Sequence, residues 1–398
     1  MKQALSLLAL LFCCLGVGAQ AATSRPAPSA FEQASALPGG AAAVVTAERV
    51  LKQRGFGYAD MQAKTPFDAH TLQNVGSVSK TVVGVALVKG IELGWFDLDT
   101  DIERILPYKI GKPGAAPITI RHLATHTSGI VDDDAVYGHS YYLTAHARKD
   151  RALYRQFKRD YTLGQRRDLG LANFLRAYLA ADGRYFKKSN FSKAAPGSAY
   201  VYSNIAAALA AHLVEIKSGQ SFEQFTQQHI FLPLGMRSTS WQPGAEAMKR
   251  HATVYNRKLQ AYPHYGLITY PDGGLTSSAA DLSAYLMAMM RGYGGQPSIL
   301  SKEGFRLLFD KQFADDKIPA GSPKGEPNSG VFWRIKRNGH IGHTGSDPGI
   351  TAFLFFDPAS GKGKILLTNT EFGGAGEAEE ARVEQQFLAL WKALDTLD

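Results

Sequence analysis

The stretch Gly76-SVSKTVVGVALVK-Gly90 carries apolar residues on every face when it is drawn as a helix. A helix on the surface of a protein keeps a polar face, so this pattern predicts a helix that is buried on all sides. Near its start, Ser77 and Lys80 are three residues apart, and this spacing places both side chains on one face. We therefore expect a central buried helix that presents a serine and a lysine together.

A serine beside a lysine becomes a nucleophile when the lysine amine is neutral. Burial beside apolar neighbours would favour the neutral amine of Lys80, which could then accept the proton of Ser77. The N-terminus of the helix would favour the negative charge that develops. Taken alone, Ser-x-x-Lys is common by chance, and a capping serine with a surface lysine is the simpler interpretation.

Two further motifs favour the chemical interpretation. Tyr202-Ser203-Asn204 precedes a helical run, and it supplies a phenol that can relay protons and an amide that can hold Lys80 or a substrate carbonyl. His343-Thr344-Gly345 ends a predicted strand, where glycine would let the backbone of a substrate approach the strand edge. The three motifs in this order are much harder to obtain by chance than any one of them.

Strands are predicted at both ends of the chain and helices in the middle. The predicted strands are a hairpin at Ala41–Tyr58, then Val331–Arg337, His340–His343, Thr351–Phe356 and Lys364–Thr368. The other predicted helices are Thr119–Gly129, Ile205–Ser218, two that open at Ser221 and Ser278, and Glu377–Leu394. We expect residues 39–95 and 320–398 to build an α/β lobe with one sheet, and residues 96–319 to build a helical lobe, with a site in the cleft between them.

The motif set resembles class C β-lactamases and the related serine DD-peptidases and esterases. Three more stretches are similar to that family, and the likeness extends from about Ala42 to the final helix: Arg121–Gly129, Pro196–Asn204 and Tyr270–Ser278. The resemblance implies a two-lobed β-lactamase/DD-peptidase-like α+β fold over residues 39–398, with an antiparallel sheet flanked by helices and an all-helical lobe. It also implies a serine hydrolase that needs no cofactor.

The resemblance implies a role for each motif residue. Ser77 would be the acylated nucleophile, and Lys80 its base or proton relay. Tyr202 would protonate the leaving group and then activate the deacylating water, while Asn204 would orient Lys80 and bind substrate. His343, Thr344 and Gly345 would bind substrate. The oxyanion hole would consist of the backbone N–H groups of Ser77 and Ser346.

Two departures from the family pattern concern substrate choice. His343 stands where most true β-lactamases have lysine, and a histidine with a pKa of about 6.5 is only partly charged at pH 7. It should hold a carboxylate less firmly, which favours a peptidase, amidase or esterase over an antibiotic hydrolase. The basic, aromatic stretch 137–167 is interpreted as an insertion that could form one side of the cleft. A surface loop without a role in the site is the competing interpretation.

Metal sites find little support in the sequence. His122 and His126 are four residues apart, as helical zinc ligands are, but position 123 is not glutamate and no third ligand is evident. The run Asp132–Asp134 could attract a cation, yet a solvated turn is the simpler interpretation. We therefore predict no metal and no cofactor.

The first residues predict export. An apolar run from Leu5 to Val17 and the small-residue signal Ala19-Gln20-Ala21 indicate a signal peptide at 1–21, followed by a Pro-rich linker at 22–38. A lipid anchor on Cys13 or Cys14 is the less favoured alternative. We expect a periplasmic or secreted protein with no transmembrane segment.

The expected partner is a small-molecule or peptide substrate. The formal charge of the chain is +9, but nucleic acid is the least plausible partner for an exported protein; a cell-wall peptide suits that charge and location better. A D-amino-acid peptidase, a carboxylesterase and a β-lactamase-like enzyme stay open as activities. From another class of protein, a catalytically silent binder of cell-wall fragments or penicillin is the alternative.

Overall fold

The computed structural model describes residues 31, 36–112, 114, 116–161, 170–372 and 378–396. The predicted signal peptide and most of the predicted linker lie outside the described residues. Within the described part of the chain, no helix is both long enough and apolar enough to cross a membrane.

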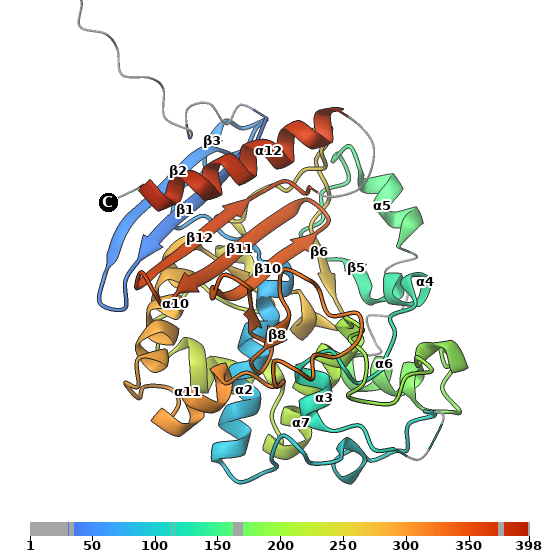
Figure 1. Ribbon diagram of the computed structural model, residues 1–398. Coiled ribbons are helices and arrows are strands. Elements are labelled where there is room, and N and C mark those ends of the chain that lie inside the picture. Colours follow the sequence, from blue (N-terminus) through green and yellow to red (C-terminus); the bar gives the residue numbers. More distant parts are fainter. Residues whose placement is uncertain are drawn as a thin grey trace, which may run out of the picture.

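An eight-stranded antiparallel sheet crosses the molecule in the order β3-β2-β1-β12-β11-β10-β9-β8 (Figure 1). Its strands are β1 (Gly39–Val45), β2 (Val50–Asp60), β3 (Thr65–Pro66), β8 (Asn328–Ser329), β9 (Arg334–Ile335), β10 (Ile341–Asp347), β11 (Ile350–Asp357) and β12 (Lys362–Thr368). Two small pairs lie outside it, β4 (Gln73–Asn74) with β7 (Thr276–Ser277) and β5 (Tyr141–Leu143) with β6 (Tyr265–Leu267). The predicted N-terminal hairpin is confirmed as β1 and β2.

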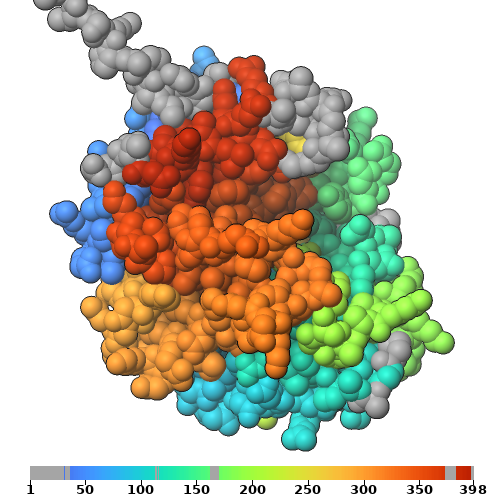
Figure 2. Space-filling view, in the orientation of Figure 1, coloured from blue at the N-terminus to red at the C-terminus, as the bar shows by residue number. Residues whose placement is uncertain are grey.

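The helices lie on both faces of the sheet and beside it. They are α2 (Ser79–Glu92), α3 (Ile120–Ala124), α4 (Asp134–Tyr137), α5 (Tyr154–Asp160), α6 (Gly170–Leu179), α7 (Asn204–Ser218), α8 (Phe222–Thr226), α9 (Ala245–Met248), α10 (Ala279–Tyr293), α11 (Lys302–Phe309) and α12 (Ala378–Ala393). Figure 1 shows α12 lying across one face of the sheet, with α2, α10 and α11 on the other side. In the space-filling view, the C-terminal segments in orange and red lie beside the green middle of the chain (Figure 2).

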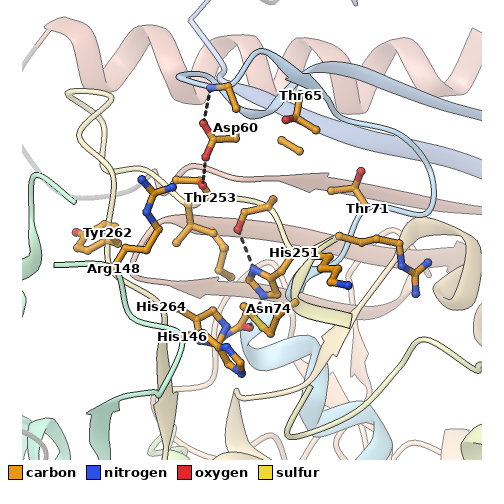
Figure 3. Close-up of a pocket in the computed structure, with 18 of the residues that line it drawn as sticks. Asp60, Thr65, Thr71, Asn74, His146, Arg148, His251, Thr253, Tyr262 and His264 are labelled. Carbon is orange, nitrogen blue, oxygen red and sulfur yellow. Dashed lines mark hydrogen bonds between the residues drawn. The ribbon is translucent and has the colours of Figure 1, made fainter. Parts of the chain in front are cut away.

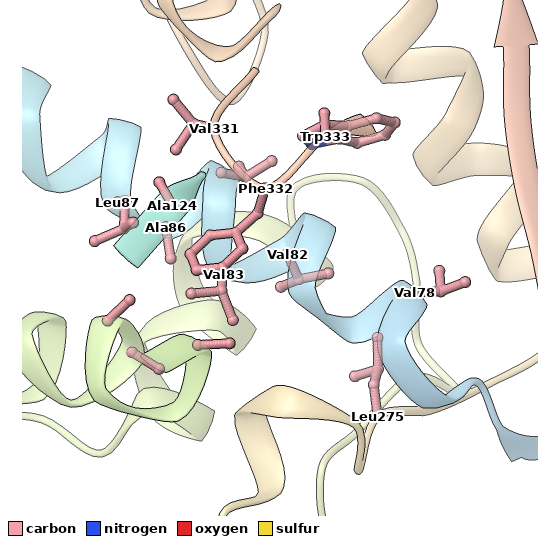
Figure 4. Packing of buried hydrophobic residues seen from close by; sticks show 14 of the residues in the cluster. Val78, Val82, Val83, Ala86, Leu87, Ala124, Leu275, Val331, Phe332 and Trp333 are labelled. Carbon is pink, nitrogen blue, oxygen red and sulfur yellow. The ribbon is translucent and has the colours of Figure 1, made fainter. Parts of the chain in front are cut away.

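The central buried helix is confirmed as α2. Val82, Val83 and Leu87 are at most 1% exposed, and the helix packs against buried residues from several segments (Figure 4). Close packing leaves no room at Gly84, where an ideal Cβ atom would lie 2.1 Å from the carbonyl oxygen of Val331. Burial on every side holds the start of the helix in one place, as a catalytic group requires.

The capping residues named from the sequence do cap their helices. Thr119, Ser221 and Ser278 each accept a hydrogen bond from a backbone N–H in the first turn of α3, α8 and α10. Gly219 ends α7 in the left-handed conformation, with φ of 67°. These signals are local, so the sequence alone is enough to place them.

The predicted strand Val331–Arg337 is wrong except at its centre. Only Arg334 and Ile335 form a strand there, β9, while Val331, Phe332 and Trp333 are buried in a loop. Phe332 has φ of 58°, and its N–H donates to the carbonyl of Ala124 beside α2 (Figure 4). The apolar run therefore covers the central helix instead of pairing with another strand.

Candidate active site

Ser77 lies in a single helical turn, Gly76–Val78, that leads into α2. Its Oγ atom is 2.9 Å from Lys80 Nζ and accepts a 2.8 Å hydrogen bond from the hydroxyl of Tyr202. Gly76 has φ of 53°, which favours glycine, and an ideal Cβ atom there would lie 2.8 Å from the amide nitrogen of Ser346. The turn thus places the serine beside two groups that can move its proton.

Lys80 is completely buried, and its amine has three polar neighbours. Besides Ser77, Nζ donates to Asn204 Oδ1 at 2.7 Å and to the carbonyl oxygen of Asp272 at 2.6 Å. It also lies 5.0 Å from the centre of the Tyr202 ring. The expected i,i+3 arrangement of Ser77 and Lys80 is therefore present, and Asn204 orients the amine as the resemblance implies.

Tyr202 and Asn204 are positioned by the N-terminus of α7. Ser203 caps this helix, and Asp132 accepts hydrogen bonds from Ser203 Oγ at 2.6 Å and from the N–H of Asn204 at 2.7 Å. Burial raises the pKa of Asp132. Asp132 is therefore a structural anchor of the second motif, and the predicted solvated turn fits only the exposed Asp134.

His126 supports Tyr202 from the other side. Its ring centre lies 4.3 Å from that of Tyr202, and its Nδ1 atom accepts a hydrogen bond from the N–H of Ser203. Burial lowers the pKa of His126 well below 6.5, so the ring is neutral near pH 7. His122 instead accepts from the N–H of Thr119 in a capping box. The described residues contain no cluster of three or more side chains suited to a metal ion.

The third motif lies inside β10, which continues to Asp347 and does not end at His343 as predicted. An ideal Cβ atom on Gly345 would lie 2.0 Å from the carbonyl oxygen of Val75 and 3.2 Å from the amide nitrogen of Ser77. The absence of a side chain at Gly345 therefore makes room for the main chain at Val75, and not for the backbone of a substrate as predicted. The same close approach brings the Ser77 and Ser346 amides together, as an oxyanion hole requires.

The surroundings of His343 oppose the partial charge expected from its sequence position. Burial lowers the pKa of His343 well below 6.5, and the positive charges of Arg334 and Lys80 act in the same direction. Its Nδ1 atom lies 2.5 Å from the carbonyl oxygen of Thr344, while Nε2 has no partner among the described residues. His343 is thus a neutral group, and it cannot hold a carboxylate by charge near pH 7.

A cavity of about 350 Å³ opens at these residues. It is lined by the predicted Ser77, Tyr202, Asn204, His343, Thr344 and Ser346, and by Tyr137, Tyr141, Leu267, Asp272, Gly273, Arg334 and Asp347. Lys80 and Gly345 lie behind this wall, in contact with Ser77. The structure therefore brings all the residues of the three motifs into one place.

Comparisons with known proteins agree with this geometry. A family model described as Beta-lactamase matches residues 28–389. The chain belongs to the beta-lactamase family. Staphylococcus aureus Protein flp (strain MW2) is 22% identical over 347 residues, which are 84% of this chain and 60% of that protein. This beta-lactamase-family chain thus spans about 60% of the length of that relative.

Two solved structures show the same fold. An octameric penicillin-binding protein homologue from Pyrococcus abyssi superposes with a TM-score of 0.65 at 22% identity, covering 91% of this chain and 75% of that one. A class C beta-lactamase mutant superposes with a TM-score of 0.64 at 20% identity, covering 90% and 93%. The two-lobed β-lactamase/DD-peptidase-like fold class expected from the sequence is confirmed.

Arg334 is a site residue of this family member that the motifs did not reveal. It comes from β9, and its guanidinium lies 5.3 Å from the centre of the Tyr202 ring. It is paired with Glu326 at 2.5 Å and hydrogen-bonded to the hydroxyl of Tyr200. Since burial keeps His343 neutral, Arg334 is the cation among the described residues that line this cavity. The sequence around Arg334 does not indicate a site residue, because the pairing of β9 with β10 is what brings its side chain to the cavity.

The insertion supplies one wall of the cavity. Tyr137 donates a 2.8 Å hydrogen bond to Asp272 Oδ1, and Tyr141 donates one of 2.5 Å to Asp347 Oδ1. The described part of the predicted stretch 137–167 therefore reaches the site. Both aspartates were missed from the sequence because each precedes a turn rich in glycine or proline, where aspartate is common.

A larger cavity, of about 600 Å³, lies away from Ser77 (Figure 3). It contains His146, His251 and His264, together with Arg148 and Arg151 from the basic stretch. Both arginines already form ion pairs, with Asp150 and Asp60 respectively. The cavity does not contain the motif residues.

Replacing Gly345 with alanine is expected to impair both folding and catalysis. The new Cβ atom would have to push the Val75 carbonyl aside, and overpacking of this kind costs about 1–3 kcal/mol of unfolding free energy. Thermal unfolding and the rate of Ser77 modification measure the two effects. Gly325→Ala is the matched control, because Gly325 is an exposed loop glycine with open space around it and no left-handed backbone. A variant with unchanged stability and activity would show that the close approach is unimportant.

Proposed function

We propose that this chain is an exported serine hydrolase that cleaves an amide or an ester through an acyl-enzyme on Ser77. The observation that supports this most directly is the position of Ser77 Oγ, within hydrogen-bonding distance of both Lys80 Nζ and the Tyr202 hydroxyl. Geometry of this kind is what activates a serine nucleophile. A protein that only binds its ligand has no need of these two groups.

Acylation begins when Lys80, aided by Tyr202, takes the proton of Ser77. The Oγ atom attacks the substrate carbonyl carbon, and the resulting oxyanion accepts hydrogen bonds from the N–H groups of Ser77 and Ser346. Removing one donor of an oxyanion hole typically costs about 3–4 kcal/mol in the transition state. The bond to the leaving amine or alcohol then breaks, and the Tyr202 hydroxyl supplies the proton that the leaving group takes.

Deacylation repeats these steps with water as the nucleophile. Tyr202 accepts a proton from the water, which attacks the acyl carbonyl in the same oxyanion hole. When the acyl–oxygen bond breaks, Ser77 Oγ recovers a proton through Lys80 and a carboxylic acid leaves. The acidic and basic groups return to their starting states, so the cycle uses water alone.

Export is part of the proposal. The leader at 1–21 carries the features of a cleavable signal peptide, and cleavage after Ala21 would release the protein into the periplasm or the medium. A cell-wall peptide would then be within reach of the cavity, as the resemblance to DD-peptidases implies.

The nucleophile can be tested by intact mass. The purified protein is incubated with a penicillin and, separately, with a p-nitrophenyl ester, beside a Ser77→Ala control. We expect a covalent adduct or product release that is absent from the control, because Ser77 Oγ lies beside both Lys80 and Tyr202. The lifetime of the adduct separates a trapped acyl-enzyme from an efficient hydrolase. If neither reagent gives adduct or turnover, a silent binder of cell-wall fragments becomes the better hypothesis.

A further inference from the structure

Two carboxylates in the cavity have an oxygen without a hydrogen bond. Asp272 is 1% exposed and Asp347 is partly buried, and both line the cavity that contains Ser77. Tyrosine hydroxyls bind their Oδ1 atoms, but the buried Oδ2 atom of each makes no hydrogen bond of normal geometry. A buried carboxylate oxygen without a donor costs free energy, and a ligand that donates a hydrogen bond to it would offset that cost.

No cation of the protein pairs with these two carboxylates among the described residues. The charge of Lys80 acts on both carboxylates, but its amine is bound to Ser77, Asn204 and the main chain of Asp272. Arg334 is bound to Glu326. Two acidic groups therefore share one cavity, and neither has an ion pair with any residue that the structure describes.

The charge of Asp272 also acts on Asp347. Burial raises the pKa of Asp272 to about 7 and that of Asp347 to about 7, and the nearby Asp272 raises the pKa of Asp347 further. Lys80 and the hydroxyls around the pair act in the opposite direction and do not offset burial. A positive group placed between them would relieve both the repulsion and the lack of donors.

The position of the pair identifies the part of the substrate that it would meet. Along β10, His343 comes before the oxyanion donor Ser346, and Asp347 follows it. Tyr202, which protonates the leaving group, lies against Arg334 on the His343 side. The leaving group therefore belongs on that side, and the acyl group extends toward Asp347 and Asp272.

We propose that Asp272 and Asp347 form a cation subsite for the acyl part of the substrate, so that preferred amides and esters carry an ammonium group close to the carbonyl that Ser77 attacks. Amino-acyl compounds with a free amino group are the chemical class that fits. Tyr137 and Tyr141, from the insertion, hold the carboxylates in place. The inference rests on the proposed function, because it concerns the substrate of the same serine.

A competing role for the pair is to stabilise a protonated Lys80. The two roles differ in what they predict for substrates of different charge. A role toward Lys80 would affect every substrate alike, whereas a subsite affects only those that carry the cation.

The first test compares alanine ethyl ester with ethyl lactate, each as both enantiomers, at pH 7 in a pH-stat. The two esters differ only by an ammonium group in place of a hydroxyl. We expect kcat/KM to be about tenfold or more higher for the amino ester of at least one enantiomer, because hydrogen bonds to ionised groups are the strong ones. p-Nitrophenyl acetate, run with the Ser77→Ala control, reports the hydrolase activity itself.

Variants then connect the preference to the carboxylates. Asp347→Asn and Asp272→Asn keep the shape and remove the charge, so we expect the ratio of kcat/KM between the two esters to fall to about one in each. Asp134→Asn, at an exposed position on α4, is the matched control and should leave the ratio unchanged. Circular dichroism confirms that each variant is folded, and the second aspartate variant serves if the first does not fold.

The outcomes separate the two proposals. Ser77-dependent hydrolysis of p-nitrophenyl acetate with no preference for the amino ester would overturn the subsite and leave the hydrolase standing. A preference that survives both aspartate variants would also overturn the subsite. Equal losses for both esters would favour the role toward Lys80. If no compound shows Ser77-dependent turnover, the proposed function fails and the subsite fails with it.

Discussion

Replacing Lys80 with methionine is expected to lower the rate of Ser77 acylation by about 10²–10⁴-fold, the range for removal of a general base. Methionine fills much of the same buried space, but it cannot accept the serine proton. It also leaves Asn204 Oδ1 and the Asp272 carbonyl without their donor, and each unpaired buried group costs about 1–3 kcal/mol. We therefore expect a folded, less stable protein that acylates very slowly.

The measurement is the rate of adduct formation by intact mass, with thermal unfolding recorded alongside. Lys89→Met is the matched control, because Lys89 lies on the same helix but pairs with Glu92 near the surface. Acylation at the parental rate in the Lys80 variant would remove Lys80 from the mechanism.

Tyr202→Phe is expected to slow turnover by a similar factor, about 10²–10⁴-fold, while stability changes little. Phenylalanine keeps the ring that packs on His126 and lies near the Arg334 guanidinium. It loses only the hydroxyl, which is 2.8 Å from Ser77 Oγ. Because the hydroxyl serves both halves of the cycle, any acyl-enzyme that forms should also persist longer.

Stopped-flow turnover and the lifetime of the mass adduct report the two halves separately. Tyr58→Phe, at an exposed position on β2, controls for the loss of a phenol elsewhere. Unchanged kinetics in the Tyr202 variant would leave Lys80 as the base that serves both acylation and deacylation.

Much of the site was accessible from sequence because it rests on short-range signals. The spacing of Ser77 and Lys80, the motif Tyr202-Ser203-Asn204 before a helix and the apolar helix are each encoded within a few residues. The fold class followed from the arrangement of these motifs along the chain, together with the resemblance that they carry.

The features that were missed depend on contacts between distant segments. Arg334 enters the cavity because β9 pairs with β10, and the charge of His343 is set by burial among neighbours from other elements. Likewise, Asp272 and Asp347 meet the insertion through tyrosines that are more than a hundred residues away in the chain. Residue type and local spacing do not predict contacts between segments that are distant in the sequence.

The pairing of β1 with β12 has a consequence for how the molecule is made. Gly40 lies opposite Thr368, so the centre of the sheet cannot close until nearly the whole chain has been synthesised. Pairing across so long a stretch is slow, because the loop must be ordered before its contacts form. A newly made chain therefore cannot bring Ser77 and Ser346 together until its last strands have been made, so the site forms late in folding.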